Sequence, residues 1–308
     1  MSDYSVIFPG QGSQNKDMLD LYRDNNPFNQ TIDMASEILG YNIRQVVLDD
    51  RLNDTLYTQP ILLAVSVGIW RAWQDKFKVT PAVAAGHSLG EYSAIVASGV
   101  LSFEDCIKLV QKRASLMVEA CKGRKTLMAA VIGLDKEKII TICQQLTKPD
   151  YVVEAVNFNS ALQTVIGGDY LAVEESITPL KSAGAKLVKK LDVSVASHTS
   201  IMEKCSNDLY KYMINMNFSN PNFELIHNYD ASSKSEINDI IQALSKQLFS
   251  PVKWVDSINM ISNMGINKYI EIGPGKVLTG LVKRINKNAT INSLSEETDI
   301  ADTIKTVS

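Results

Sequence analysis

Hydrophobic and polar positions along the chain follow two periods, and these predict alternating strands and helices. Short apolar runs indicate buried strands, and apolar residues that recur at every third or fourth position indicate amphipathic helices. Before residue 125 the pattern predicts two strands and three helices, at 4–8, 82–85, 58–74, 89–99 and 102–121. Strands that alternate with helices favour a largely parallel, doubly wound sheet.

The pattern changes near residue 125. From there on, the predicted order is strand, helix, strand, strand, helix, strand, at 126–133, 135–146, 151–158, 162–168, 170–184 and 185–195. This βαββαβ order is typical of a ferredoxin-like fold. We therefore predict a ferredoxin-like subdomain at 125–195, inserted into a larger α/β core that comprises 1–124 and 196–308. The second part of the core alternates again, with helices and strands at 200–213, 223–229, 235–250, 255–265, 268–273 and 276–286.

The pentapeptide GHSLG at 86–90 lies between a predicted strand and a predicted helix. Gly-x-Ser-x-Gly at such a junction is the nucleophile-elbow signature. Its glycines admit a strained turn that exposes the hydroxyl of Ser88 at the start of the helix. There the backbone N–H of Leu89 is placed to stabilise an oxyanion. A turn without chemistry is the simpler alternative, because the motif is short.

A serine hydroxyl is a weak nucleophile and needs a base within hydrogen-bond reach. The chain offers three histidines as candidates. His87 adjoins Ser88, and a neighbouring side chain tends to point away from the serine. His227 ends a predicted strand, where a structural histidine is the simpler interpretation. His198 lies between a predicted strand and a helix, in a loop expected at the carboxyl edge of the sheet, and is the favoured base.

Two glycine-containing segments follow predicted strands. The loop FPGQGSQ at 8–14 should open on the same edge as the elbow, and Gln11 could then donate to an oxyanion. A simple glycine-rich turn is the alternative interpretation. The segment EIGPGKVLTG at 271–280 fits neither of the common phosphate-binding patterns. We predict that it is a tight turn from a strand into a helix.

One arginine projects from the apolar side of a predicted helix. In the helix at 102–121, Arg113 is spaced four residues from Leu109 and from Met117, which face the core. A buried guanidinium needs an anionic or carbonyl partner. Arg113 is therefore either part of a structural ion pair or the anchor for the carboxylate of a substrate.

Composition narrows the class of protein. The 308 residues are 45% hydrophobic and 21% charged, which is typical of a soluble globular protein, and the formal net charge of −3 argues against nucleic-acid binding. The N-terminus lacks the pattern of a signal peptide, and the most apolar window, 60–70, is too short to span a membrane. Four cysteines without CxxC spacing indicate reduced thiols in a cytoplasmic protein. The histidines are scattered, so we predict no metal.

Eight segments in order resemble the malonyl-CoA:acyl carrier protein transacylase family. They are FPGQGSQ, YTQPILLA, GHSLGEYSA, KRASLM, AVNFNS, VASH, QLFSPVKW and EIGPGKVLTGL, between residues 8 and 281. Each segment is short, whereas the ordered set is specific. Acyltransferase domains of polyketide synthases are similar. The resemblance implies an α/β-hydrolase-like core with a mainly parallel sheet and an inserted ferredoxin-like subdomain.

The resemblance also implies roles for individual residues. Ser88 matches the nucleophile and His198 its base. Gln11 and the N–H of Leu89 match the oxyanion hole, and Arg113 matches the arginine that holds the malonyl carboxylate.

Two glutamines gain roles only through the resemblance. Gln247 matches the residue whose carbonyl orients the histidine, and Gln59 matches a position near the acyl group.

Two features depart from the family pattern or bear on its specificity. NFNSALQ at 157–163 replaces the usual NFNSPGQ, and Ser197 is a residue that accompanies a methylmalonyl preference in some polyketide acyltransferases. Discrete family members carry the same serine, so malonyl remains the expected acyl group.

The implied function is transfer of malonyl from malonyl-CoA to the phosphopantetheine thiol of acyl carrier protein, through a malonyl-serine ester, for fatty acid synthesis. We expect a monomer without a cofactor of its own. Carrier proteins of this kind are acidic, so candidates for docking are Lys181, Lys186, Lys189, Lys190, Lys283 and Arg284. The alternatives are an acyltransferase for a polyketide or polyunsaturated lipid synthase, an esterase or thioesterase, and a non-catalytic carrier-binding subunit.

Overall fold

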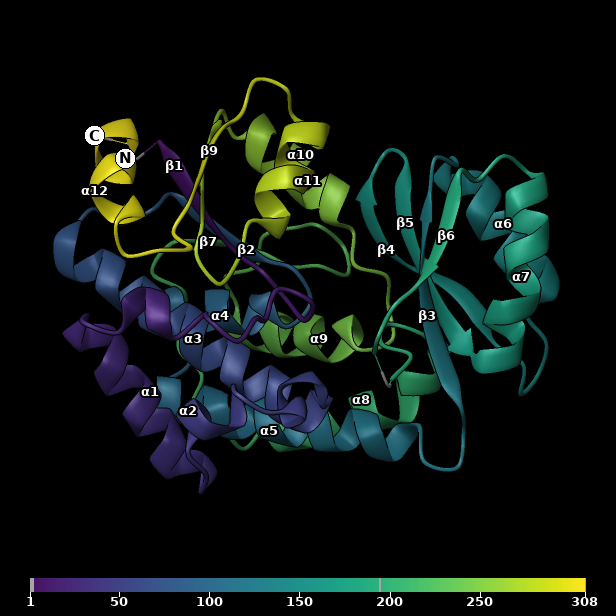
Figure 1. Ribbon diagram of the computed structural model, residues 1–308, viewed down its shortest axis with the longest axis horizontal. Coiled ribbons are helices and arrows are strands. Elements are labelled where there is room, and N and C mark those ends of the chain that lie inside the picture. The colour runs from purple at the N-terminus through teal and green to yellow at the C-terminus, as the bar shows by residue number, and fades with distance from the viewer. Residues whose placement is uncertain (1–2, 194, 308) are drawn as a thin grey trace.

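The structure is a computed structural model that describes residues 3–193 and 195–307. It contains a five-stranded parallel sheet and a four-stranded antiparallel sheet, with helices around both (Figure 1). The order of the parallel sheet is β7 (Glu224–Ile226), β2 (Val83–Gly86), β1 (Tyr4–Phe8), β8 (Lys268–Glu271) and β9 (Thr290–Ser293). The predicted mixed α/β fold with a mainly parallel sheet is confirmed.

The antiparallel sheet has the order β4 (Val153–Ser160), β5 (Gln163–Asp169), β3 (Thr126–Ile132) and β6 (Leu187–Lys190). Helix α6 (Lys136–Leu146) follows β3, and α7 (Tyr170–Ser182) follows β5. Chain order is therefore βαββαβ, as the sequence pattern predicts. Figure 1 shows this sheet at one end of the long axis, with α6 and α7 on its outer side. The division of the chain into two domains stays a prediction.

Ten further α-helices surround the parallel sheet in the described part of the chain. They are α1 (Asn26–Leu39), α2 (Ile43–Val46), α3 (Thr55–Lys76), α4 (Gly90–Ala97), α5 (Phe103–Ala120), α8 (Glu203–Met213), α9 (Ile237–Gln247), α10 (Trp254–Asn263), α11 (Val277–Ile285) and α12 (Asp299–Val307). Alternate residues of β1 enter different apolar clusters, since Val6 and Phe8 face one side and Ile7 the other. Both faces are covered, which explains why the strands read as continuous apolar runs.

Several elements differ from the sequence prediction. The pattern predicts nothing at α1, α2, β9 or α12. Strand β9 lies at the sheet edge and is only half-buried, so it lacks an apolar run. The strand predicted at 185–195 is wrong in length, because β6 covers only Leu187–Lys190 at the edge beside β3. Ser194, within that prediction, lies outside the described residues. Among the described residues, no helix has the length and apolar character needed to cross a bilayer.

Close contact between backbones brings the elbow and the first loop together. A Cβ on Gly86 would lie 1.9 Å from the carbonyl carbon of Gly90, and one on Gly90 would lie 2.0 Å from the carbonyl oxygen of Phe8. A Cβ on Gly10 would lie 2.4 Å from the carbonyl oxygen of His87. Only glycine fits at these three positions. The turn after β2 and the loop after β1 therefore meet at the carboxyl edge of the parallel sheet.

We predict that Gly86→Ala lowers the free energy of unfolding by about 3 kcal/mol or more, because the new methyl group overlaps rigid backbone. The matched control is Gly280→Ala in α11, where a Cβ meets nothing within 4 Å. That change should stabilise the protein by about 0.5–1 kcal/mol, because alanine favours a helix interior. Urea unfolding of both variants measures the two effects. Equal stability of Gly86→Ala and the wild type would contradict the close packing of the elbow.

Candidate active site

Ser88 lies in a strained turn between β2 and α4. Its φ is +52°, a left-handed conformation that is uncommon for any residue but glycine. Asn228, just after β7, bridges this turn. Its Oδ1 accepts the Ser88 N–H at 2.7 Å, and its Nδ2 donates to the carbonyl oxygen of Gly86 at 2.6 Å. The strand–turn–helix geometry is that of a nucleophile elbow.

His198 is placed against the Ser88 hydroxyl. The distance from its Nε2 to Ser88 Oγ is 2.7 Å, and the distance from its Nδ1 to the main-chain carbonyl oxygen of Gln247 is also 2.7 Å. A carbonyl only accepts hydrogen bonds, so Nδ1 carries the proton and Nε2 is free to accept from the serine. The backbone of His198 is held as well, because its N–H donates to Leu248 O at 2.8 Å.

Burial keeps the His198 imidazole neutral. The residue is 2% exposed. Desolvation, followed by the positive charge of Arg113, lowers its pKa from the ordinary 6.5 to about 3. The ring is therefore in its basic form throughout the physiological range of pH.

Arg113 is buried on α5 and is 1% exposed, as its place on the apolar side of the helix predicts. Its Nη1 donates to Gln59 Oε1 at 2.5 Å and its Nη2 to Gln247 Oε1 at 3.1 Å. Its guanidinium carbon lies 5.2 Å from the centroid of the Tyr92 ring. Among the described residues, no carboxylate pairs with Arg113, and its Nε has no hydrogen-bond partner. The structural ion pair is therefore absent from this part of the chain.

A cavity of about 90 Å³ joins these groups. Ser88, His198, Arg113, Gln11 and Leu89 all line it. The hydroxyl of Thr55 donates to Gln11 Oε1 at 2.9 Å, which leaves the amide nitrogen of Gln11 as a donor. The opposite wall comes from the antiparallel sheet and the segment after it, through Met128, Asn157, Val165, Leu191 and Val193. His87 and Ser197 also line this cavity.

The other histidines do not contact the Ser88 hydroxyl. His87 Nε2 lies 2.8 Å from Asn159 Oδ1, and burial lowers the pKa of His87. His227 Nδ1 lies 2.8 Å from Glu91 Oε1. Among the described residues, no three or more His, Cys, Asp or Glu side chains gather to hold a metal ion.

Sequence reasoning missed Asn228 and Glu91. Both are fully buried, and both hydrogen-bond to residues that lie more than a hundred positions away in the chain. Glu91 in the first turn of α4 looks like an ordinary acidic residue at a helix start. The one signal for Asn228 is its place in the segment HNYD, directly after β7, which puts a polar residue at the edge of the sheet.

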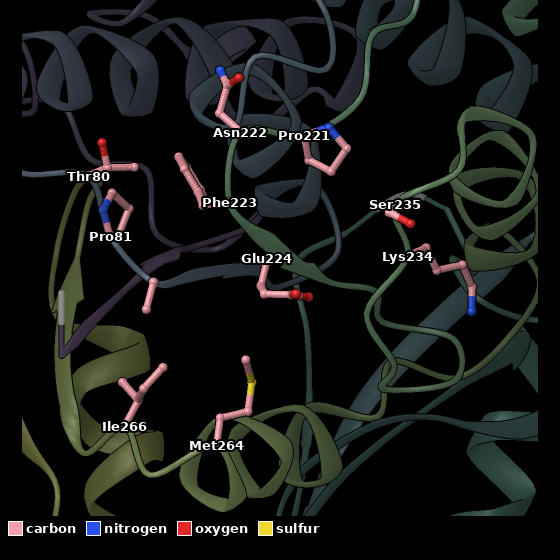
Figure 2. A pocket seen from close by; sticks show the side chains of 11 residues that line it. Thr80, Pro81, Pro221, Asn222, Phe223, Glu224, Lys234, Ser235, Met264 and Ile266 are labelled. Carbon is pink, nitrogen blue, oxygen red and sulfur yellow. The ribbon is translucent and has the colours of Figure 1, made fainter. Parts of the chain in front are cut away.

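A larger cavity, of about 730 Å³, lies elsewhere (Figure 2). Its lining includes Pro81 just before β2, Phe223 just before β7, and Ile266 just before β8. It therefore opens at the amino ends of the parallel strands, opposite to the edge where ligands bind in α/β sheets. Figure 2 shows no histidine among its labelled side chains. The smaller cavity at Ser88 is the candidate active site.

Comparison with known proteins agrees with this geometry. A sequence model described as the acyl transferase domain matches residues 6–304. The malonyl CoA-acyl carrier protein transacylase of Haemophilus influenzae is 44% identical over 290 residues, which cover 92% of this chain and 93% of the relative. That of Escherichia coli K12 is 39% identical over 305 residues, which cover 98% of each. The chain therefore belongs to the acyl transferase domain family, in its group of malonyl CoA-acyl carrier protein transacylases.

Solved structures give the same result. A structure of a type II PKS acyl-carrier protein in complex with its malonyl-transacylase matches with a TM-score of 0.96 and 39% identity, over 99% of this chain and 100% of the other. An acyl carrier protein S-malonyltransferase from Vibrio cholerae matches with a TM-score of 0.93 and 42% identity, over 98% and 99% of the two chains. The resemblance stated from the sequence motifs is confirmed.

We predict that the reactivity of Ser88 changes little between about pH 8 and pH 5, because a His198 pKa of about 3 keeps the base neutral over that range. The measurement is the rate at which methanesulfonyl fluoride labels Ser88, followed by mass spectrometry. A histidine with the ordinary pKa of 6.5 would lose roughly 30-fold in rate by pH 5. An acid limb with its midpoint near that ordinary value would contradict the prediction.

Proposed function

We propose that this chain transfers a malonyl group from malonyl-CoA to the phosphopantetheine thiol of an acyl carrier protein in fatty acid synthesis. One observation carries the proposal. Arg113 is a buried cation without a carboxylate partner among the described residues, and it lines the same small cavity as the pair formed by Ser88 and His198. A nucleophile beside an arginine that lacks a carboxylate partner suits an acyl group that ends in a free carboxylate. The names of the relatives support the same substrate and acceptor.

The proposed reaction has two half-reactions. In the first, His198 Nε2 takes the hydroxyl proton as Ser88 Oγ attacks the thioester carbonyl. The oxyanion faces the Leu89 N–H and the Gln11 amide, and CoA leaves as a thiol that carries the proton from His198. In the second, the carrier thiol gives its proton to His198 and attacks the malonyl-serine ester. The ester C–O bond breaks, and His198 returns the proton to Ser88 Oγ. Gln247 holds the histidine through its main-chain carbonyl, and Gln59 helps to hold Arg113.

The proposed architecture is an α/β-hydrolase-like core, 1–124 and 196–308, with a ferredoxin-like subdomain at 125–195. The elbow at the carboxyl edge of a parallel sheet and the βαββαβ order support it. We propose that the protein acts as a monomer without its own cofactor and resides in the cytoplasm. The four cysteines are free and buried, as in reduced compartments.

A polyketide carrier is the second candidate acceptor, because one solved relative is a malonyl-transacylase bound to a type II PKS acyl-carrier protein. An ordinary esterase is disfavoured, since the base is held by a carbonyl of Gln247 instead of a carboxylate. Incubation with malonyl-CoA and each holo carrier protein tests the proposal. Malonyl carrier protein is the expected product, and release of free malonate alone would contradict transfer.

We predict that Ser88→Ala abolishes formation of the malonyl-enzyme and leaves the melting temperature close to that of the wild type, because only one oxygen is removed. The control is Ser98→Ala. It removes a buried hydroxyl just after the end of α4, which donates to the carbonyl oxygen of Ile95. Intact-protein mass spectrometry after mixing with malonyl-CoA should show the ester in the control alone. Labelling of Ser88→Ala at another residue would contradict the assigned nucleophile.

We predict that Arg113→Ala slows malonyl transfer by roughly two to four powers of ten, since loss of one partner of a desolvated charge pair costs about 3–5 kcal/mol. Acetyl-CoA has no free carboxylate, so acetyl transfer should not fall. Arg71→Ala is the control, because Arg71 is a half-buried arginine that hydrogen-bonds to Thr31 and lies away from the cavity. Equal losses for both acyl groups, with a lower melting temperature, would assign Arg113 to the scaffold.

A further inference from the structure

Glu91 is a fully buried carboxylate that the reaction described above does not use. It lies in the first turn of α4, three residues after Ser88. Its Oε1 accepts from His227 Nδ1 at 2.8 Å. Its Oε2 accepts from the N–H of Asn228 at 3.1 Å and from Gln247 Nε2 at 2.8 Å. The carboxylate is thus held by the segment directly after β7 on one side, and it contacts the last residue of α9 on the other.

Gln247 is the residue that Glu91 reaches, and it contacts three groups of the active site. Its Nε2 also donates to Ser88 O at 2.9 Å, its Oε1 accepts from Arg113 Nη2 at 3.1 Å, and its main-chain carbonyl holds His198 Nδ1. A single side chain therefore connects the nucleophile and the cation, and the backbone of the same residue holds the base.

A glutamine amide can take two orientations, and only one serves this site. A carboxylate accepts hydrogen bonds and donates none, so the amide nitrogen of Gln247 must face Glu91. The amide oxygen must then face Arg113, whose guanidinium only donates. With the reverse orientation, two donors would oppose each other at Arg113, and two acceptors would oppose each other at Glu91. Two acceptors, Glu91 Oε2 and Ser88 O, therefore fix the orientation of the Gln247 amide and place its oxygen against Arg113.

We propose that Glu91 is a positioning residue for the acyl group: by accepting the Gln247 amide it orients Arg113 toward the substrate carboxylate. This inference rests on the proposed malonyl transfer. It assigns to Glu91 an effect on the choice of acyl group that a carboxylate with a purely structural role would not have.

The chain offers a matched control. Glu271, at the end of β8, is also fully buried, and it also accepts three hydrogen bonds, from the N–H groups of Leu278 and Thr279 and from the Thr279 hydroxyl. All three bonds go to the start of α11, and none goes to a residue that lines the cavity at Ser88. Removing Glu271 therefore removes a buried carboxylate of the same kind without touching Gln247.

Two substitutions of Glu91 separate the effect of losing the hydrogen-bond acceptor from the effect of changing the size of the side chain. Glu91→Leu keeps an apolar side chain of similar size but no acceptor. Glu91→Gln keeps one oxygen for Gln247 and Asn228, and its amide nitrogen can donate to His227 Nδ1, which accepts in its other tautomer. The measured quantity is the ratio of kcat/KM for malonyl-CoA to kcat/KM for acetyl-CoA in formation of the acyl-enzyme, with the melting temperature of each variant.

The ratio should fall by roughly 10- to 100-fold in Glu91→Leu, the range expected when a buried hydrogen bond to a charged group loses its support. It should stay within about threefold of the wild type in Glu91→Gln and in Glu271→Leu. Adding Glu91→Leu to Gln247→Ala should change the ratio by less than about threefold, because residues that act through one another are not additive. If Glu91→Leu does not fold, Glu91→Asp replaces it, since the shorter side chain withdraws the oxygen from Gln247, and its ratio should also fall.

Other outcomes would overturn the inference. An unchanged ratio with equal losses for both acyl groups, as a structural carboxylate predicts, would do so. A fall in Glu91→Gln as large as in Glu91→Leu, or a full effect of Glu91→Leu in the Gln247→Ala background, would do so as well. A wild-type enzyme that forms no malonyl-enzyme and no malonyl carrier protein would instead refute the proposed function itself.

Discussion

The strained turn at Ser88 is the constraint on which the rest of the site depends. A non-glycine residue at a φ of +52° costs about 1–3 kcal/mol and persists only where its surroundings hold it. Backbone contacts at Gly86 and Gly90 leave the chain no alternative path, and Asn228 hydrogen-bonds to both sides of the turn. Because the turn fixes the direction of Ser88 Oγ, every other group must be brought to that oxygen.

Three separate parts of the chain meet this requirement. The loop after β1 brings Gln11, because its glycine packs against the backbone of the elbow. The end of α9 brings Gln247, whose carbonyl and side chain serve different partners. The antiparallel sheet supplies apolar side chains such as Met128 and Val165 as the facing wall. An apolar wall in a small cavity limits the water that could hydrolyse a serine ester before the thiol arrives.

Site residues could be predicted from the sequence where their signal is local, and could not where their partners lie far away in the chain. Ser88 and its glycines form a local motif, and the burial of Arg113 follows from the helical period alone. Both features could therefore be predicted from the sequence. Gln247, Asn228 and Glu91 are polar residues whose partners come from distant parts of the chain. In the local sequence, Gln247 and Glu91 look like ordinary surface residues, and Asn228 is marked only by its place directly after a strand. For Gln247 the family resemblance supplied the signal. The sequence pattern also failed to predict elements at the edge of the sheet, such as β9, because half-buried strands carry little apolar pattern.

In the proposed reaction, Arg113 links recognition of the substrate to the strength of the base. Its positive charge is the second cause, after burial, that lowers the pKa of His198. Its hydrogen-bond partners among the described residues, Gln59 and Gln247, are neutral, so no carboxylate contacts this charge there. In the proposed reaction, a malonyl carboxylate bound at Arg113 offsets the charge and raises the proton affinity of His198 when the histidine accepts the serine proton. An acyl group without a carboxylate leaves the base weaker, so in this proposal Arg113 favours malonyl both in binding and in the chemical step.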